Sequence, residues 1–458
     1  MRKTLTQPSL KQMLATEVDI YQEQFAKFQQ EQFAFTPTWL RDLRRRGMDE
    51  FIELGIPTTR QEDWRFTNIS ALAGRPYKTR TPESVTNEDV ENLVQQGMLD
   101  TSFHRLVFVN GRFAAQWSSI FNGHDAHDGN DGVVIENLAA SIQNRSEWMQ
   151  NHVARLAVFD ESAFIALNTA FINDGAFVDV PSGVVVERPV HLMFLSIDNG
   201  QTVCHPRSLI RLGKGSRATV IESYLGRDGD EYFTNTVSEI EIGESAELDH
   251  YKLQHEQLGA LHVATTQIYQ QSQSCFRSHY FSFGASLVRN ELNCMLAGEE
   301  IECTLNGLYM PTGDQHMDCR TRIDHAKPHC KSFELYKGIL DDRSRGVFNG
   351  KIFVHQDAQK TDAKQSNQAL LLSDDAIIDT KPQLEIYADD VRCTHGATIG
   401  ELDEQAIYYL RSRGIPADLA RKMLIFAFAN DLVQGVDVPA VKKQLETILL
   451  SSHGLPNV

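Results

Sequence analysis

IRLGKGS, residues 210–216, returns 30 residues later as IEIGESA, residues 240–246. Weaker copies of this apolar-then-turn pattern fall near Gln271, Gly298, Ala326 and Gln356, at intervals of 28, 27, 28 and 30 residues. A steady period of this length is typical of stacked supersecondary units. Because the units are strand-like, the pattern predicts a mainly β fold, a β-solenoid over residues 151–400. The alternative, a β-sandwich, does not repeat one unit so often.

The cysteines are interpreted on this repeat. Cys275, Cys303 and Cys330 are spaced by 28 and 27 residues, so we expect them at nearly the same position of successive coils, with Ala218 and Leu248 at that position in earlier coils. Free cysteine behaves as a small buried hydrophobe. The three are therefore expected to form an inward-facing ladder, and metal or sulfur ligation is the alternative.

Both ends of the chain carry helical patterns. Apolar residues recur at spacings of three and four before residue 70, and Thr36-Pro37 predicts an N-cap and a first-turn proline for a helix ending near Gly55. Arg44, Arg45 and Arg46 are expected on a solvated helix face. We expect a helical and mixed N-terminal domain over 1–150, the solenoid over 151–400, and a C-terminal helical domain over 401–458.

Two motifs lie between the first helices and the solenoid. Asn110-Gly111 between alternating apolar residues predicts a hairpin. The loop FNGHDAHDGNDG, residues 121–132, holds His124, Asp125, His127 and Asp128, which could bind a metal. Nothing stiff holds these side chains in ligand geometry, so a surface loop is the favoured interpretation.

The C-terminal segment predicts two helices. One runs through Tyr408 and ends at Gly414, and Pro416 opens the next. The second contains Met423, Leu424, Ile425, Phe426 and Phe428, which leave it little polar face. A helix that is apolar nearly all round is buried. It packs either on its own domain or against a partner, and the residues alone leave both open.

The composition limits the class of protein. The formal charge of −17 argues against nucleic acid and anionic membrane as main partners. No run of 18 apolar residues predicts a membrane span, and MRKTLTQPSLKQML does not resemble a signal peptide. Seven cysteines without a CxxC motif predict reduced thiols and a cytoplasmic protein rather than a disulfide framework or an autonomous cluster.

The segment YADDVRCTHGATIG, residues 387–400, carries the chemistry. In an extended strand Cys393 and His395 project from the same face. A thiolate beside an imidazole suits iron or a sulfur-handling site, and an imidazolium lowers the pKa of a neighbouring thiol. A closed tetrahedral site needs four ligands, so the others would come from elsewhere, with a partner as one source. The alternative is a buried cysteine and a hydrogen-bonded histidine that end the solenoid.

Several stretches resemble one family. CTHGATIGELDEQAIYYLRSRGI (393–415) and GIPTTRQEDWRFTNI (55–69) are similar to the terminal signatures of the SufB/SufD family, which belongs to the SufBCD iron–sulfur cluster assembly complex. Residues 167–192, 348–373 and 379–391 also look like this family. The resemblance implies a right-handed parallel β-helix flanked by helical terminal domains. Gly396 and Cys393 favour the SufD branch over its paralogue SufB, which remains the alternative.

The resemblance also implies a role and partners. It implies a non-catalytic accessory subunit that acts with a SufB-like paralogue and a SufC-like ABC ATPase, with no tightly bound cofactor of its own. His395, with Cys393, would contact iron or a nascent cluster transiently near the SufB interface. The C-terminal helices, with Tyr408, Met423, Phe426 and Phe428, would dock the ATPase, and the isolated chain could form a homodimer. Two other hypotheses are a purely structural solenoid that bridges the two partners and a carbohydrate-active β-helix enzyme.

Overall fold

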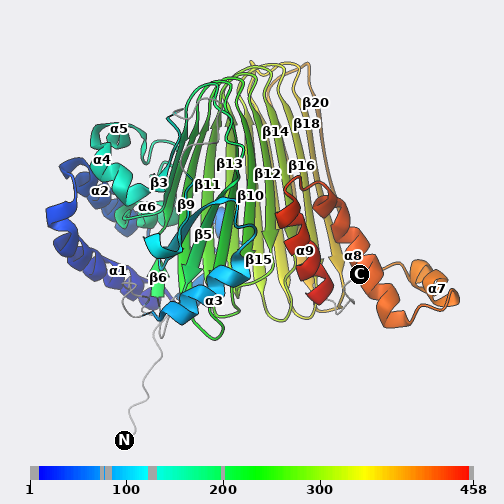
Figure 1. The fold of residues 1–458 in the computed structure, drawn as a ribbon. Coiled ribbons are helices and arrows are strands. Elements are labelled where there is room, and N and C mark those ends of the chain that lie inside the picture. The colour runs from blue at the N-terminus through cyan, green and yellow to red at the C-terminus, as the bar shows by residue number, and fades with distance from the viewer. Residues whose placement is uncertain (1–9, 73–76, 78–84, 122–131, 198–201, 453–458) are drawn as a thin grey trace, which may run out of the picture.

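The computed structural model describes residues 10–72, 77, 85–121, 132–197 and 202–452. It is mostly β, a parallel β-solenoid of about seven turns with helices at both ends (Figure 1). The predicted solenoid is therefore confirmed. Two long sheets face each other around its core, and from β7 onward successive strands of the chain alternate between them.

The first sheet contains, in spatial order, β2 (Arg112–Phe113), β1 (His104–Val109), β5 (Val190–Ser196), β8 (Arg217–Gly226), β10 (Glu247–His255), β12 (Cys275–Ser282), β14 (Glu302–Tyr309), β16 (Lys331–Leu340), β18 (Asp362–Leu371) and β20 (Arg392–Gly400). The second sheet runs from β3 (Val134–Asn137) through β4 (Ala176–Val180), β7 (Arg207–Leu212), β9 (Tyr232–Ile242), β11 (Leu261–Gln270), β13 (Leu287–Leu296), β15 (His316–His325) and β17 (Arg345–Val354) to β19 (Ile377–Ile386), with β6 (Thr202–Cys204) beside β9. Pairing is parallel except for β1 with β2 and β3 with β4.

The register gives the repeat its physical form. Side chains joined from one coil to the next lie 30, 28, 27, 29 and 31 residues apart along the chain. Each coil also turns through one residue with a left-handed backbone, whose N–H donates to a carbonyl of the next coil. These residues are Gly215, Ser245, Gln273, Glu300, His329 and Lys360. The GKGS and GESA turns recur because each coil reuses this connection.

The cysteine ladder was partly wrong. Cys303 does lie in the column of Ala218 and Leu248, and the next rungs of that column are Ser332, Ala363 and Cys393. Cys275, however, pairs with Glu302 and is half-exposed beside Arg277. Cys330 is buried two residues before the column position Ser332 and donates to the carbonyl of Gly298. The coil lengths vary by a residue or two, which moves equal spacings onto different faces.

The N-terminal helices gather beside the first coils (Figure 1). They are α1 (Leu10–Gln32), α2 (Thr38–Leu54), α4 (Leu138–Asn144), α5 (Ser146–His152) and α6 (Ala163–Ala170). The helix α3 (Asn87–Gly97) packs on β5 and β8. Short 3-10 turns span Phe33–Phe35, Glu62–Trp64, Ser70–Leu72 and Ala115–Trp117. The helix α2 ends at Gly55 as predicted, and Asn110-Gly111 forms the predicted hairpin.

Two details of α2 differ from the sequence prediction. Pro37, rather than Thr36, is its N-cap residue, and the Thr36 hydroxyl instead donates to the carbonyl of Gln32. Arg44 is buried, and its Nε donates to the carbonyl of Ile172, so the arginine run is not a uniformly solvated face. Arg45 keeps the exposed position that was expected for it.

A buried ion pair attaches these helices to the solenoid. Arg207 and Glu239 are each about 1% exposed and are joined at 2.7 Å. Glu239 also accepts from the backbone N–H groups of Ala154, Leu156 and Ala157, and Arg207 donates to Asn168 at the end of α6. One carboxylate thus compensates both a buried guanidinium and the loop before α6.

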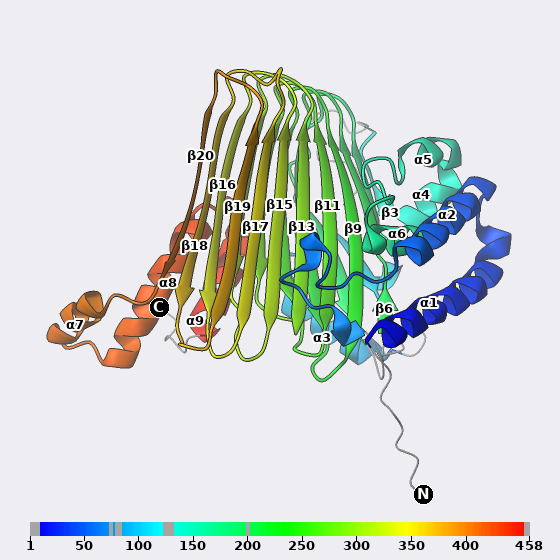
Figure 2. The ribbon, with the colours of Figure 1, turned by 180° about the vertical axis from the view of Figure 1, so that it is seen from behind.

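The C-terminal segment forms α7 (Glu404–Ser412), α8 (Ala417–Gln434) and α9 (Pro439–Ser452). The helices α8 and α9 cover the outer face of the first sheet. The apolar faces of α8 and α9 pack on Tyr251, Phe281, Leu308 and Ile339, side chains of strands far apart in the sequence. The helix α7 projects away from the solenoid beyond its last coils (Figures 1 and 2).

Candidate functional site

The solenoid is open at its C-terminal end. The strands β19 and β20 each pair with the preceding strand of their sheet, and within the described residues their other edges have no strand partner. Ile377, Ile386 and Ile399 of these strands are 53%, 39% and 51% exposed. An edge of unpaired backbone groups beside exposed apolar side chains is a template for pairing with another chain.

Cys393 and His395 lie on β20 at this open end. They occupy the columns above Ala363 and Gln365, which are buried interior positions of the preceding coil. Both therefore belong to the interior face of the last coil, the same-face arrangement predicted from the sequence. Cys393 is half-buried and packs on the small cluster around Ala363, whereas His395 is exposed.

The expected activation of the thiol is wrong for this structure. Burial raises the pKa of Cys393, a backbone hydrogen bond at Ala363 lowers it by less, and the charge of Asp362 raises it by a still smaller amount. A thiol in this environment is protonated at neutral pH and ionises when a metal binds it. The surroundings of Cys393 therefore do not activate its thiol as a nucleophile.

A line of polar groups runs inward from His395. Its column continues through Gln365 to Glu334 and then to Leu305. Gln365 Nε2 donates to Glu334 Oε2 at 2.8 Å, and Thr321 of the opposite sheet donates to the other carboxylate oxygen. Burial raises the pKa of Glu334 to about 7. Leu305 ends the line and separates it from a second interior polar cluster around Glu222 and His250.

The site is incomplete as a metal centre. In the parts of the chain that the structure describes, no group of three or more His, Cys, Asp or Glu side chains is arranged to hold a metal ion. A cysteine and a histidine supply two ligands, and tetrahedral sites need four. The remaining ligands of any metal held at His395 must come from outside the described residues, as solvent or another chain.

The residues expected to dock an ATPase divide into two groups. Tyr408 of α7 and Met423 of α8 are 73% and 40% exposed, and both are free to contact a partner. Phe426 and Phe428 are instead partly buried in the cluster beneath α8, where Lys337 lies 4.6 Å from the ring centroid of Phe428. The apolar helix thus uses one face on its own solenoid and leaves another exposed.

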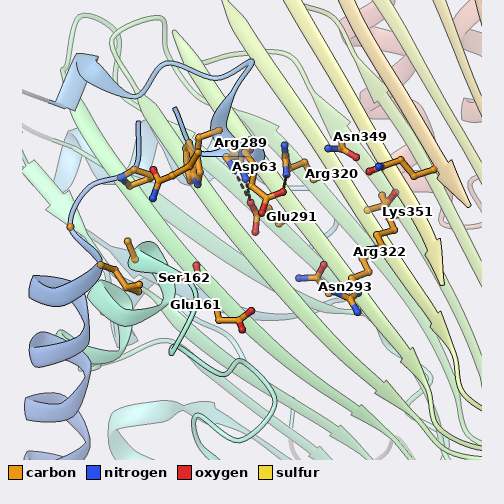
Figure 3. Close-up of a pocket in the computed structure, with 18 residues that line it drawn as sticks. Asp63, Glu161, Ser162, Arg289, Glu291, Asn293, Arg320, Arg322, Asn349 and Lys351 are labelled. Atoms are coloured by element: carbon orange, nitrogen blue, oxygen red, sulfur yellow. Dashed lines mark hydrogen bonds and ion pairs between the residues drawn. The ribbon is translucent and has the colours of Figure 1, made fainter. Parts of the chain in front are cut away.

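A second polar site lies on the outer face of the second sheet. The segment after α2 crosses this sheet (Figure 2), and a cavity of about 320 Å³ opens beside it (Figure 3). Four cations line it, and each pairs with a carboxylate: Arg289 with Glu291, Arg320 with Asp63, Arg322 with Asp324 and Lys351 with Glu385. Trp64 stacks on Arg289 with the guanidinium 3.7 Å from its ring centroid. With its positive charges neutralised, the cavity is an anchor for the segment rather than an anion site.

Sequence reasoning did not find Gln365 or Glu334. Their signal is the repeat itself, because they precede His395 by one and two coils. The predicted metal candidates of the 121–132 loop, His124, Asp125, His127 and Asp128, lie outside the described residues. Among the described helices, none is long and apolar enough to cross a membrane.

The fold and the open end define a class: a helix-flanked β-solenoid whose terminal coil presents a thiol and an imidazole at an unpaired edge. Comparison with known families agrees. Residues 194–428 match the model described as "SUF system FeS cluster assembly, SufBD core domain", and residues 15–192 match the SufBD protein N-terminal region.

Curated relatives carry related names. An iron–sulfur cluster assembly SufBD family protein of Synechocystis is 34% identical over 88% of this chain and 89% of its own length. Iron–sulfur cluster assembly protein SufD of Escherichia coli is 32% identical, over 88% and 90%. SufD of Bacillus subtilis is 26% identical, over 95% and 98%. The chain belongs to the SufBD family, and its role lies in iron–sulfur cluster assembly.

Proposed function

We propose that this chain is a non-catalytic SufD-type subunit that supports iron acquisition and cluster assembly in the cytoplasm. The observation that carries the proposal is the open terminal coil, which places Cys393 and His395 side by side beneath an unpaired strand edge. Thiolate and imidazole are suitable ligands for iron. The metal is cargo here: His395, with Cys393, holds iron or a nascent cluster, and the partner supplies the missing ligands.

The proposed partner at the open end is a SufB-like paralogue. A second parallel solenoid would continue the hydrogen bonding of β19 and β20 and cover Ile377 and Ile399. A ligand set split between two chains forms only when they meet, which ties cluster formation to the assembled complex. In the absence of the paralogue, two copies of this chain can cover each other's edge.

The proposed partner at the C-terminal helices is a SufC-like ABC ATPase. The exposed faces of α7 and α8, with Tyr408 and Met423, are the candidate contact. The buried face of α8 packs across several coils of the first sheet. Movement imposed on α8 by nucleotide binding in the ATPase would thus be passed to the coils that carry the open end, with ATP hydrolysis remaining in the partner.

Two experiments test the function. Purification of the tagged chain from native extract should recover an ABC ATPase and a SufB-like chain, and recovery of neither contradicts the proposed complex. In anaerobic reconstitution of that complex with iron and sulfide, His395→Ala should abolish most cluster formation and Cys393→Ala should reduce it. A His395→Ala complex that forms clusters normally would support the other candidate, a solenoid that only bridges its partners.

A further inference from the structure

The interior side chain directly behind His395 is unusually constrained. Gln365 is 3% exposed and lies between Glu334 and His395 in one column of the first sheet. Its Nε2 donates to Glu334 Oε2 at 2.8 Å. On the opposite sheet stands Gly350, where a Cβ would lie 2.3 Å from the same nitrogen. The missing side chain of Gly350 leaves room for the amide nitrogen, and the hydrogen bond to Glu334 sets the direction of the amide.

The other end of this amide is unsatisfied. Gln365 Oε1 is buried and accepts no hydrogen bond from the described residues. A buried acceptor without a donor costs about 1–3 kcal/mol. The next rung of the column is His395, and neighbouring strands lie only about 4.8 Å apart. An imidazole N–H of His395 is a donor that could satisfy this oxygen.

We propose that Gln365 is a positioning residue for His395: its Oε1 accepts the N–H of one imidazole nitrogen and leaves the other nitrogen, unprotonated, directed out of the open end. Metal-binding histidines are oriented in this way by an acceptor behind the ring, which fixes the tautomer. The hydrogen bond forms when the exposed His395 side chain turns toward the interior. The consequence for iron rests on the proposed function, whereas the orientation of the ring does not.

The test is the tautomer of His395 in the full-length chain. Long-range proton–nitrogen NMR spectra of protein with labelled histidine, at about pH 8.5 where imidazoles are neutral, report which ring nitrogen carries the proton. His395→Ala identifies the signals. We expect one dominant tautomer in the wild type and a shift toward the mixture of free imidazole in Gln365→Leu. Gln365→Glu, which keeps an acceptor oxygen, should retain the wild-type tautomer.

The matched control is Asn367→Leu. Asn367 is the neighbouring interior amide of β18 and lies beneath Ala397 instead of His395. It should leave the His395 signals unchanged. Thermal melting checks that each variant folds, and Gln365→Met replaces Gln365→Leu if the latter does not. Wild-type His395 signals in folded Gln365→Leu or Gln365→Met, or equal changes in Asn367→Leu, would overturn the proposal.

A second arm separates this proposal from the proposed function. Ferrous iron binding by the assembled complex is measured for the wild type, His395→Ala and Gln365→Leu. Loss of an outer-sphere partner typically weakens metal binding about 10- to 100-fold, and Gln365→Leu should fall in this range. If the tautomer depends on Gln365 but His395→Ala leaves iron binding unchanged, the positioning contact stands and the proposed function fails.

Discussion

At the residue scale, the buried carboxyl of Glu334 accepts two hydrogen bonds and nevertheless has a raised pKa. Its pKa is raised from an ordinary 4.5 to about 7 because burial disfavours the charged form more than Thr321 and Gln365 favour it. The folded chain therefore holds this proton more tightly than the unfolded chain does. The associated stability is fully present below about pH 4.5 and is lost as the pH rises through 7.

A Glu334→Gln variant should remove this dependence. The glutamine has no charge to bury, so at pH 8 the variant should unfold at a higher temperature than the wild type. Its free energy of unfolding should be larger by up to about 3 kcal/mol. The gain should shrink as the pH falls toward 5. Thermal melts at a series of pH values measure this stability difference. The Gln365→Glu variant adds a second buried carboxyl and should be less stable than the wild type at pH 8.

The Arg207–Glu239 pair gives a second prediction at this scale. Glu239→Gln leaves a buried guanidinium without its counter-charge, and such losses cost about 3–5 kcal/mol. We expect a large drop in the denaturation midpoint. The matched control is Lys214→Gln, which breaks the exposed bridge of Lys214 to Glu244 and should change stability by less than about 1 kcal/mol. Equal effects would contradict the role given to burial.

At the element scale, α8 separates stability from docking. Ile425 is 6% exposed in the cluster against the first sheet, whereas Met423, two residues earlier, is 40% exposed. Ile425→Ala should lower the free energy of unfolding by about 2–5 kcal/mol. Met423→Ala should leave stability nearly unchanged and weaken association with the ATPase, measured by calorimetry. If Met423→Ala binds like the wild type, the contact lies elsewhere on α7 and α8.

The turns of the solenoid make another element-scale prediction. Gln273 and Glu300 adopt left-handed backbone angles of 62° and 58°, which cost an L-residue about 1–2 kcal/mol. Gln273→Gly relieves this strain, although it also frees the unfolded chain, so it should be neutral or mildly stabilising. Gly215→Val at the equivalent turn should destabilise. Chemical denaturation compares the two variants, and a clear loss of stability in Gln273→Gly would contradict this account of the turn.

At the scale of the whole molecule, the uncovered terminal coil predicts self-association. Ile399 is 51% exposed on β20, and a lysine there blunts a strand edge. The isolated wild-type chain should form dimers as its concentration rises, and Ile399→Lys should remain monomeric in sedimentation analysis. Tyr408→Lys, a change on the projecting helix α7, is the control and should dimerise like the wild type.

Much of this architecture could be predicted from the sequence because each coil repeats the same local chemistry. The period, the Asn110-Gly111 hairpin and the stop at Gly55 are local signals, and all three hold. The facing of Cys275 could not be predicted, because coil lengths of 27 to 31 residues move a fixed spacing from interior to exterior. Arg44 was missed for a related reason: its acceptor, the carbonyl of Ile172, is 128 residues away.

The candidate site shows the same division. Cys393 and His395 are two residues apart, so their shared face follows from strand geometry alone. Gln365 and Glu334 reach the same column only through the register of β16, β18 and β20. The prediction for α8 was half right, since its composition predicted burial but not which of Met423 and Phe428 the solenoid would cover.

Parallel stacking also means that the number of coils sets the length of the solenoid. Every coil adds one strand spacing, about 4.8 Å, so the separation between the N-terminal helices and the terminal coil can change only in whole steps. Removing one coil would keep every local contact type and still draw His395 one step closer to the opposite end of the chain. A partner that contacts both ends of the solenoid would no longer fit after that change. The number of coils is therefore itself a determinant of which complexes can assemble.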